Sequence, residues 1–252
     1  MADKKQSSNN LVIENTRQKI TFSILEAYKT IRTNIITLLE KKNAKFFAIS
    51  SSNAMEGKST TALNIAITFS QLEKKVLIID TDIRRPSLQK KLKMDNHSGL
   101  LDYVLNELPL KDVIQSHSEF LDVITCRPLP SKSNEVISSQ KFDELLEEVR
   151  DKYDYIILDT PPINPVSDTL VIAQRVDALF MVVRASVTKY DAFKKAVNAL
   201  KVLGIEVDGV IINGADPRPK SYYKSIYSYY KAIIHTTNNN GRYFSRFLIL
   251  WR

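Results

Sequence analysis

The chain has 252 residues, of which 44% are hydrophobic, enough for one large or two small domains with a sizeable core. Its single cysteine, Cys126, excludes an intrachain disulfide and is compatible with a reducing compartment. No run of 18 apolar residues is present, and the polar amino-terminal residues lack the apolar centre of a signal peptide. These features predict a soluble, cytoplasmic protein.

The formal net charge of +8 is concentrated at the carboxyl-terminal end of the chain. After Asp216 there is no acidic residue and there are seven basic ones, so this segment carries +7. The residues up to 216 contain 29 basic and 28 acidic side chains, a net charge of +1. A nucleic-acid-binding face would concentrate positive charge on the folded body. The distribution therefore argues against nucleic acid as a partner.

The predicted elements begin with residues 1–22, a polar and irregular segment that is expected to be a flexible lead. Apolar side chains at helical spacing then predict a helix from Ser23 to about Leu39. Six short apolar runs with the length of strands follow, at 46–49, 76–79, 121–124, 155–158, 178–183 and 207–212. Helical patterns separate most of these runs, for example at 59–70, 141–150 and 190–203.

This alternation of strands and helices is typical of βαβ units. It predicts an α/β domain over residues 23–215, with a mainly parallel sheet flanked by helices on both faces. Beyond Gly214 the alternation stops, and Pro217 and Pro219 break the pattern. Residues 216–252 are therefore predicted to form a flexible, basic, tyrosine-rich tail.

The segment from Ser52 to Ser59 matches the P-loop pattern G-x-x-x-x-G-K-[ST] except that serine replaces the first glycine. A predicted strand before it and a predicted helix after it supply the required context, because backbone N–H groups at a helix N-terminus bind phosphates. Lys58 would neutralise the terminal phosphate oxygens, and the Ser59 hydroxyl would ligate Mg2+. Met55 is unusual, because phosphate-binding turns often need glycine. The predicted nucleotide-binding residues of this P-loop NTPase-like domain are Asn53, Ala54, Met55, Glu56, Gly57, Lys58, Ser59 and Thr60.

Three carboxylates follow predicted strands. Asp80 and Asp82 come after the second apolar run, and Asp159 ends the fourth. The carboxyl ends of parallel strands meet at one edge of a sheet, so these carboxylates can converge with the P-loop on an oxygen-liganded Mg2+. Asp80 and Asp82 would repel each other unless a metal or the following arginines, Arg84 and Arg85, supply a cation. A turn or helix cap is the structural alternative for all three aspartates.

The sequence VLIIDTDIRRP, which runs from Val76 to Pro86, resembles the additional acidic motif of bacterial protein-tyrosine kinases. The resemblance extends from about Glu26 to Asn213 and includes the segment 153–162. It implies a cytoplasmic enzyme of capsular and exopolysaccharide biosynthesis that transfers the γ-phosphoryl group of ATP to tyrosine.

The resemblance also implies a role for each matched residue. Lys58 would hold the β and γ phosphates, Ser59 and Asp159 would hold Mg2+, and Asp82 would position metal or phosphate. Asp80 would accept the tyrosine proton, because a phenol with a pKa near 10 is a poor nucleophile at neutral pH. The expected catalytic residues are thus Lys58, Asp80 and Asp82, and the expected metal ligands are Ser59, Asp82 and Asp159.

Five of the 11 tyrosines lie close together in the tail: Tyr222, Tyr223, Tyr227, Tyr229 and Tyr230. The structural alternative is an aromatic helix face, since three of them share helical spacing. The resemblance implies instead that they are phosphoacceptors, and that the tail enters the active site of a neighbouring subunit in a homo-oligomer. Five phosphotyrosines would add about −8 to −10 charges and invert the charge of the tail.

The resemblance implies two further partners, a membrane-embedded activator or co-polymerase that would hold the enzyme at the inner face of the cell membrane, and a cognate phosphatase. The apolar segment from Phe247 to Trp251 is expected either to contact a membrane interface or to pack on the domain. A partition or division-site ATPase is the alternative enzyme, although that class has an extra lysine where this chain has Asn53. A weakly catalytic nucleotide-binding scaffold is the third possibility, favoured by Ser52 and Met55.

Overall fold

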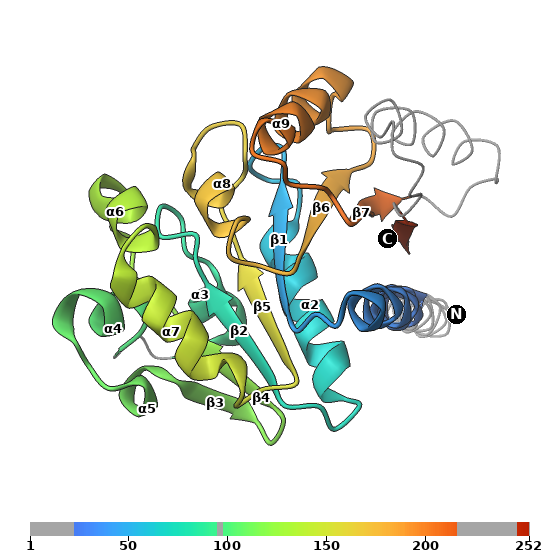
Figure 1. Cartoon of the computed structure of the whole chain (residues 1–252). Coiled ribbons are helices and arrows are strands. Elements are labelled where there is room, and N and C mark those ends of the chain that lie inside the picture. The colour runs from blue at the N-terminus through green and yellow to red at the C-terminus, as the bar shows by residue number, and fades with distance from the viewer. Residues whose placement is uncertain (1–22, 95–97, 216–245, 252) are drawn as a thin grey trace, which may run out of the picture.

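The structure is a computed structural model that describes residues 23–94, 98–215 and 246–251. These residues form one central sheet with helices on both faces (Figure 1). The strands are β1 (Phe46–Ser51), β2 (Val76–Asp80), β3 (Gln115–Ser118), β4 (Leu121–Ile124), β5 (Tyr155–Asp159), β6 (Ala178–Arg184), β7 (Gly209–Ala215) and β8 (Arg246–Trp251). Their order in the sheet is β3-β4-β2-β5-β1-β6-β7-β8, and all neighbours are parallel except β3 and β4. The predicted fold class is confirmed.

A helix at residues 23–42 precedes β1, close to its predicted bounds. The helices that follow are α2 (Lys58–Ser70), α3 (Leu88–Leu92), α4 (Leu100–Asn106), α5 (Leu110–Val113), α6 (Ser133–Ile137), α7 (Gln140–Arg150), α8 (Asp168–Ile172) and α9 (Tyr190–Val202). The long helices α2, α7 and α9 match the predicted helical patterns. The others have seven residues or fewer, too short for a helical period to be recognised in the sequence. None of the described helices has the length and apolar character that a membrane crossing requires.

Two strands at opposite edges of the sheet were not predicted as strands. β3 consists of Gln115 to Ser118, a polar and mostly exposed sequence without an apolar run, and it pairs in antiparallel fashion with β4. β8 lies within the segment assigned to the tail, and it pairs in parallel with β7, with Gly209 opposite Arg246. The backbone of this segment is therefore paired with the sheet, and the expectation for its apolar side chains stays a prediction.

The central strand β1 shows how the core is built. All six of its residues are buried, as is typical of a parallel strand covered on both faces. Phe47 faces the layer formed by α2 and the helix at 23–42, where its ring lies 5.9 Å from that of Phe69 and 5.7 Å from that of Phe180. Phe46 faces the opposite layer, with α7, α8 and α9 (Figure 1). The two layers hold β1 in the middle of the sheet.

The register of the central strands places the predicted site at one edge of the sheet. β2 and β5 are neighbours, and Asp80 lies opposite Asp159 at their carboxyl ends. β5 also pairs with β1, where Ile49 lies opposite Asp159. The residues that follow β1, β2 and β5 therefore emerge together, as expected for ligand sites of parallel sheets.

The amino-terminal helix uses its charged residues in two ways. Glu26 and Lys29 form an exposed ion pair of 2.8 Å, a contact worth only about 0.5 kcal/mol. Arg32, by contrast, donates from Nη1 to the Thr68 carbonyl in the last turn of α2, at 2.7 Å. Arg32 therefore fastens two helices of the same chain.

Candidate active site

The loop between β1 and α2 has two residues in left-handed backbone conformations, Met55 with φ 68° and Gly57 with φ 97°. A Cβ atom at position 57 would also lie 2.0 Å from Asn213 Nδ2, so any other residue there would displace the Asn213 side chain. Met55 adopts its conformation at a cost of about 1–2 kcal/mol. Its side chain is 83% exposed, so the loop accommodates methionine without a steric conflict in the core.

The Glu56 side chain turns inward and holds the loop together. Its Oε2 accepts hydrogen bonds from the backbone N–H groups of Ser52 and Asn53, at 2.9 and 3.1 Å. Its Oε1 accepts a hydrogen bond of 2.8 Å from the Thr188 hydroxyl. Burial raises the pKa of Glu56 above its ordinary value. The Glu56 side chain therefore stabilises the loop. The backbone N–H group of this predicted nucleotide-binding residue remains available to a ligand.

Residues at the ends of β6 and β7 hold the same loop from the other side. Asn213 donates from Nδ2 to the Glu56 carbonyl at 3.1 Å, and Arg184 donates from Nη1 to the Met55 carbonyl at 3.2 Å. These contacts, like that of Thr188, were missed by sequence reasoning. Each contact is made by a single polar residue that lies more than 100 positions from the loop in the sequence. No local sequence pattern predicts such a contact.

The remaining residues of the predicted loop lie at its rim. Asn53 accepts a hydrogen bond at Oδ1 from Asn164 Nδ2, at 3.3 Å, and Ala54 is exposed. Thr60 lies in the first turn of α2, where its hydroxyl accepts a hydrogen bond of 2.8 Å from Lys91 Nζ of α3. These residues are thus at least partly exposed at the edge of the loop.

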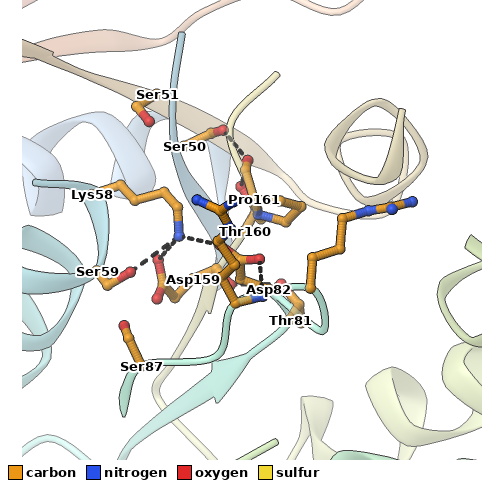
Figure 2. Close-up of polar contacts among 12 residues, drawn as sticks. Ser50, Ser51, Lys58, Ser59, Thr81, Asp82, Ser87, Asp159, Thr160 and Pro161 are labelled. Carbon is orange, nitrogen blue, oxygen red and sulfur yellow. Dashed lines mark hydrogen bonds and ion pairs between the residues drawn. The ribbon is translucent and has the colours of Figure 1, made fainter. Parts of the chain in front are cut away.

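Lys58 joins the P-loop to the carboxylates. Its Nζ lies 2.8 Å from Asp82 Oδ2 and 3.4 Å from Asp159 Oδ1, and it donates to Ser59 Oγ at 3.1 Å (Figure 2). All four residues are buried. Burial lowers the pKa of Lys58, but the charges of Asp159 and Asp82 outweigh it, and the net shift is upward. A charged ammonium group therefore sits between the two carboxylates.

Arg84 does not have the role that the sequence suggested. The cation beside the aspartates is Lys58, whereas Arg84 Nε donates to Asp168 Oδ2 at 2.8 Å at the start of α8. Asp168 also accepts a hydrogen bond from the Ser133 hydroxyl at the start of α6. Arg84 therefore fastens the loop after β2 to two helices on one face of the sheet.

Asp80 makes contacts of a different kind. Its Oδ2 accepts hydrogen bonds from the backbone N–H groups of Ser87 and Leu88, at 2.8 and 3.0 Å, and its Oδ1 accepts one from Asp82, at 3.2 Å. This is the capping arrangement that the sequence left open as an alternative. Burial, followed by the charge of Asp159, raises the pKa of Asp80 to about 7. Asp80 thus shapes the loop after β2 and also has a pKa close to neutral pH.

The residues around Lys58 fit a magnesium ion that is shared with a phosphate. Asp159 Oδ2 is buried and has no hydrogen-bond partner among the described residues. No three acidic, histidine or cysteine side chains of the described residues could hold a metal by themselves. Mg2+ usually takes one or two carboxylates together with substrate phosphates rather than an all-protein cage. Ser59 and Asp159, with Asp82 beside them, supply a donor set of that kind.

The five tail tyrosines, at positions 222, 223, 227, 229 and 230, lie outside the described residues. Their predicted role as phosphoacceptors therefore stays a prediction. The loop and helix with a buried lysine that faces two carboxylates define a P-loop nucleotide-binding domain.

Comparisons with known proteins place this domain in a family. The family model described as an AAA domain matches residues 44–203, more than half of the chain. The tyrosine-protein kinase YwqD of Bacillus subtilis is 36% identical over 199 residues, which are 79% of this chain and 84% of YwqD. The chain therefore belongs to the AAA-domain family and, within it, to the bacterial tyrosine-protein kinases.

Solved structures agree with this assignment. The kinase domain of Escherichia coli tyrosine kinase ETK superposes with a TM-score of 0.73 at 28% identity, covering 78% of this chain and 77% of that domain. The septum site-determining protein MinD of Pyrococcus horikoshii gives a TM-score of 0.59 at 20% identity, covering 72% and 76%. The likeness to MinD shows a common fold alone.

Replacing Asp80 with asparagine tests the raised pKa of this carboxyl group. Its pKa is about 7 in the folded protein, against an ordinary value of 3.8. Between about pH 4 and about pH 7 the folded state therefore retains a proton that the unfolded state has lost, so the group lowers the free energy of unfolding as the pH rises through that window.

Urea unfolding of the nucleotide-free protein at about pH 5 and about pH 8 should show a smaller loss of stability in Asp80→Asn than in wild type. Replacing the exposed Asp151 with asparagine is the control and should retain the wild-type difference. Equal pH dependence in wild type and Asp80→Asn would contradict the raised pKa.

Proposed function

We propose that this tyrosine kinase uses Mg-ATP to phosphorylate its own carboxyl-terminal tyrosines, and that it regulates the synthesis and export of a capsular polysaccharide or exopolysaccharide. The observation that carries the proposal is the position of Lys58. Its ammonium group lies between Asp82 and Asp159, next to Ser59, at the end of a P-loop. Family membership supports tyrosine as the acceptor.

The charges of the site are suited to a phosphate with a divalent cation. Asp80, Asp82 and Asp159 are buried near a single neutralising lysine. A bound Mg2+ would supply positive charge to the phosphate oxygens. Ser59 and Asp159 would hold it, and Lys58 would then be free to contact the β and γ phosphates. The carboxylates would then face the magnesium ion, and Lys58 would face the phosphates, so opposite charges would lie next to each other.

Asp80 is suited to receive the proton of the attacking tyrosine. A general base works best when its pKa lies near the operating pH, and the pKa of Asp80 is about 7. Oδ2 accepts two backbone N–H groups, but Oδ1 accepts one and retains a second lone pair. The tyrosine Oη–H proton would pass to this carboxylate as Oη bonds to the γ-phosphorus and ADP leaves. Asp82 would remain with Lys58 and position the phosphate.

The tail and the partners complete the proposal. The residues after Asp216 carry +7 and include the five clustered tyrosines, so the tail complements an acidic surface before phosphorylation and loses that complementarity afterwards. We assign as its docking surface the active-site rim of a neighbouring copy in a homo-oligomer. A membrane-embedded activator would hold the kinase at the inner face of the cell membrane. A cognate phosphatase would remove the phosphate groups from the tail tyrosines.

Replacing Lys58 with methionine tests the phosphotransfer proposal. Without the ammonium group the carboxylates repel the phosphates, so labelling of tyrosine by radiolabelled ATP should fall by about 100-fold or more. The measurement is an anti-phosphotyrosine blot alongside the radiolabel, with and without a cytoplasmic segment of the membrane partner. Lys90→Met, which removes an exposed lysine of α3, should label as wild type does.

Other outcomes of this assay would contradict the proposal. Release of phosphate without tyrosine labelling would indicate an ATPase of the partition or division-site type. Absence of both reactions in the presence of the activator segment would indicate a nucleotide-binding scaffold. Undiminished labelling by Lys58→Met would show that the described site is not the one that transfers phosphate.

The tail hypothesis predicts a change in assembly with phosphorylation. Full modification adds about −8 to −10 charges to the tail, so wild type incubated with Mg-ATP should dissociate, as followed by sedimentation velocity. A variant with all five cluster tyrosines changed to phenylalanine keeps the positive charge and should remain associated. The same sedimentation profile for both proteins after incubation would contradict the hypothesis.

A further inference from the structure

Ser87 immediately precedes α3 and is the N-cap residue of that helix. Serine is favoured at this position because its hydroxyl oxygen accepts a hydrogen bond from a backbone N–H group of the first turn. Here the side chain makes no such bond. Asp80 Oδ2 instead accepts the N–H groups of Ser87 and Leu88, at 2.8 and 3.0 Å. The carboxylate thus caps the start of α3 at two N–H groups that precede the ones a serine hydroxyl usually takes.

The Ser87 hydroxyl, which does not cap the helix, is buried. Ser87 Oγ has no hydrogen-bond partner among the described residues. Buried polar atoms in folded proteins are almost always hydrogen-bonded to protein, to water or to a ligand. A buried hydroxyl without a hydrogen bond inside the protein therefore indicates that a ligand or a water molecule binds to it.

The position of Ser87 indicates which partner that is. α3 is held against the first turn of α2 by a 2.8 Å hydrogen bond that Lys91 Nζ donates to Thr60 Oγ1. Figure 2 shows Ser87 beside Ser59, with its hydroxyl directed toward the Ser59 side chain. It therefore faces the region in which Ser59 and Asp159 would hold a magnesium ion.

We propose that Ser87 Oγ accepts a hydrogen bond from a water molecule of the magnesium shell and so positions the ion. Mg2+ keeps several of its waters when it binds to a protein, and those waters need acceptors. Partners of this outer shell orient the ligands that touch the metal and raise its affinity. Ser87 is thus a positioning residue, and the inference rests on the proposed binding of Mg-nucleotide.

Calorimetric titration with ADP over a range of Mg2+ concentrations tests this inference. Mg2+ should tighten ADP binding, and the Mg2+ concentration at which half of this effect is reached should be about 10-fold higher in Ser87→Ala than in wild type. It should leave the affinity for ADP without metal unchanged, because the hydroxyl acts through the shell of the ion. Ser87→Thr retains a hydroxyl and should behave as wild type does.

Ser139→Ala is the matched control. Ser139 is the N-cap residue of α7, and its hydroxyl does accept a hydrogen bond, from the Phe142 N–H at 3.2 Å. Its loss should lower the melting temperature by a few degrees and leave the Mg2+ dependence unchanged. Ser87→Ala should do the reverse, with a melting temperature close to that of wild type and an altered Mg2+ dependence.

The outcomes separate this inference from the function on which it rests. If wild type shows Mg2+-dependent binding of ADP and Ser87→Ala has the same Mg2+ dependence, the inference about Ser87 fails and the proposed function stands. A melting temperature of Ser87→Ala that falls as that of Ser139→Ala does, without a change in Mg2+ dependence, would show that the hydroxyl is structural. If wild type binds no ADP in Mg2+, the proposed function fails first.

Discussion

The neutralisation of buried carboxylates by Lys58 is the interaction on which the rest of the site depends. Asp80 and Asp159 are brought together by the register of β2 and β5, and Asp82 follows two residues later. Burying several like charges is costly unless a cation compensates them. Lys58 supplies one positive charge and lies within 3.4 Å of two of the carboxylates. The remaining negative charge is what makes the site suited to a divalent cation.

Contacts within the chain hold the P-loop in place. Glu56 closes the loop on itself, while Asn213 and Arg184 fasten it to the ends of two strands. The loop after β2 is fastened in the same way, by Asp80 on one side and by the Arg84–Asp168 ion pair on the other. Two loops that are fixed independently thus face each other across Lys58. A site of this kind loses little conformational entropy when it binds a phosphate.

The sequence predicted those parts of the fold and site that depend on local pattern. The buried strands appear as continuous apolar runs because both faces of a parallel sheet are covered. The P-loop and the three aspartates were recognisable because each follows such a run. β3 was missed because Gln115 to Ser118 contain no apolar residue, and β8 was missed because it follows a polar segment of the tail.

The parts that sequence reasoning could not supply depend on contacts between distant segments. The sequence offered a metal or the arginines Arg84 and Arg85 as the cation for Asp80 and Asp82, but in the structure Arg84 pairs with Asp168, 84 residues away. The inward turn of Glu56 depends on Thr188, which lies 132 residues away. Ser87 would be read from its sequence position as an ordinary helix cap. In the structure Asp80 accepts the first N–H groups of α3, and the Ser87 hydroxyl makes no cap hydrogen bond.

The central claim is that the Lys58 cluster binds a nucleotide together with magnesium, and calorimetry of wild type and Asp159→Asn tests it most directly. Mg2+ should tighten ADP binding by wild type, and the variant should lose this tightening while it still binds ADP without metal. The account is contradicted if wild type takes up no nucleotide, or if Mg2+ tightens ADP binding equally in both proteins.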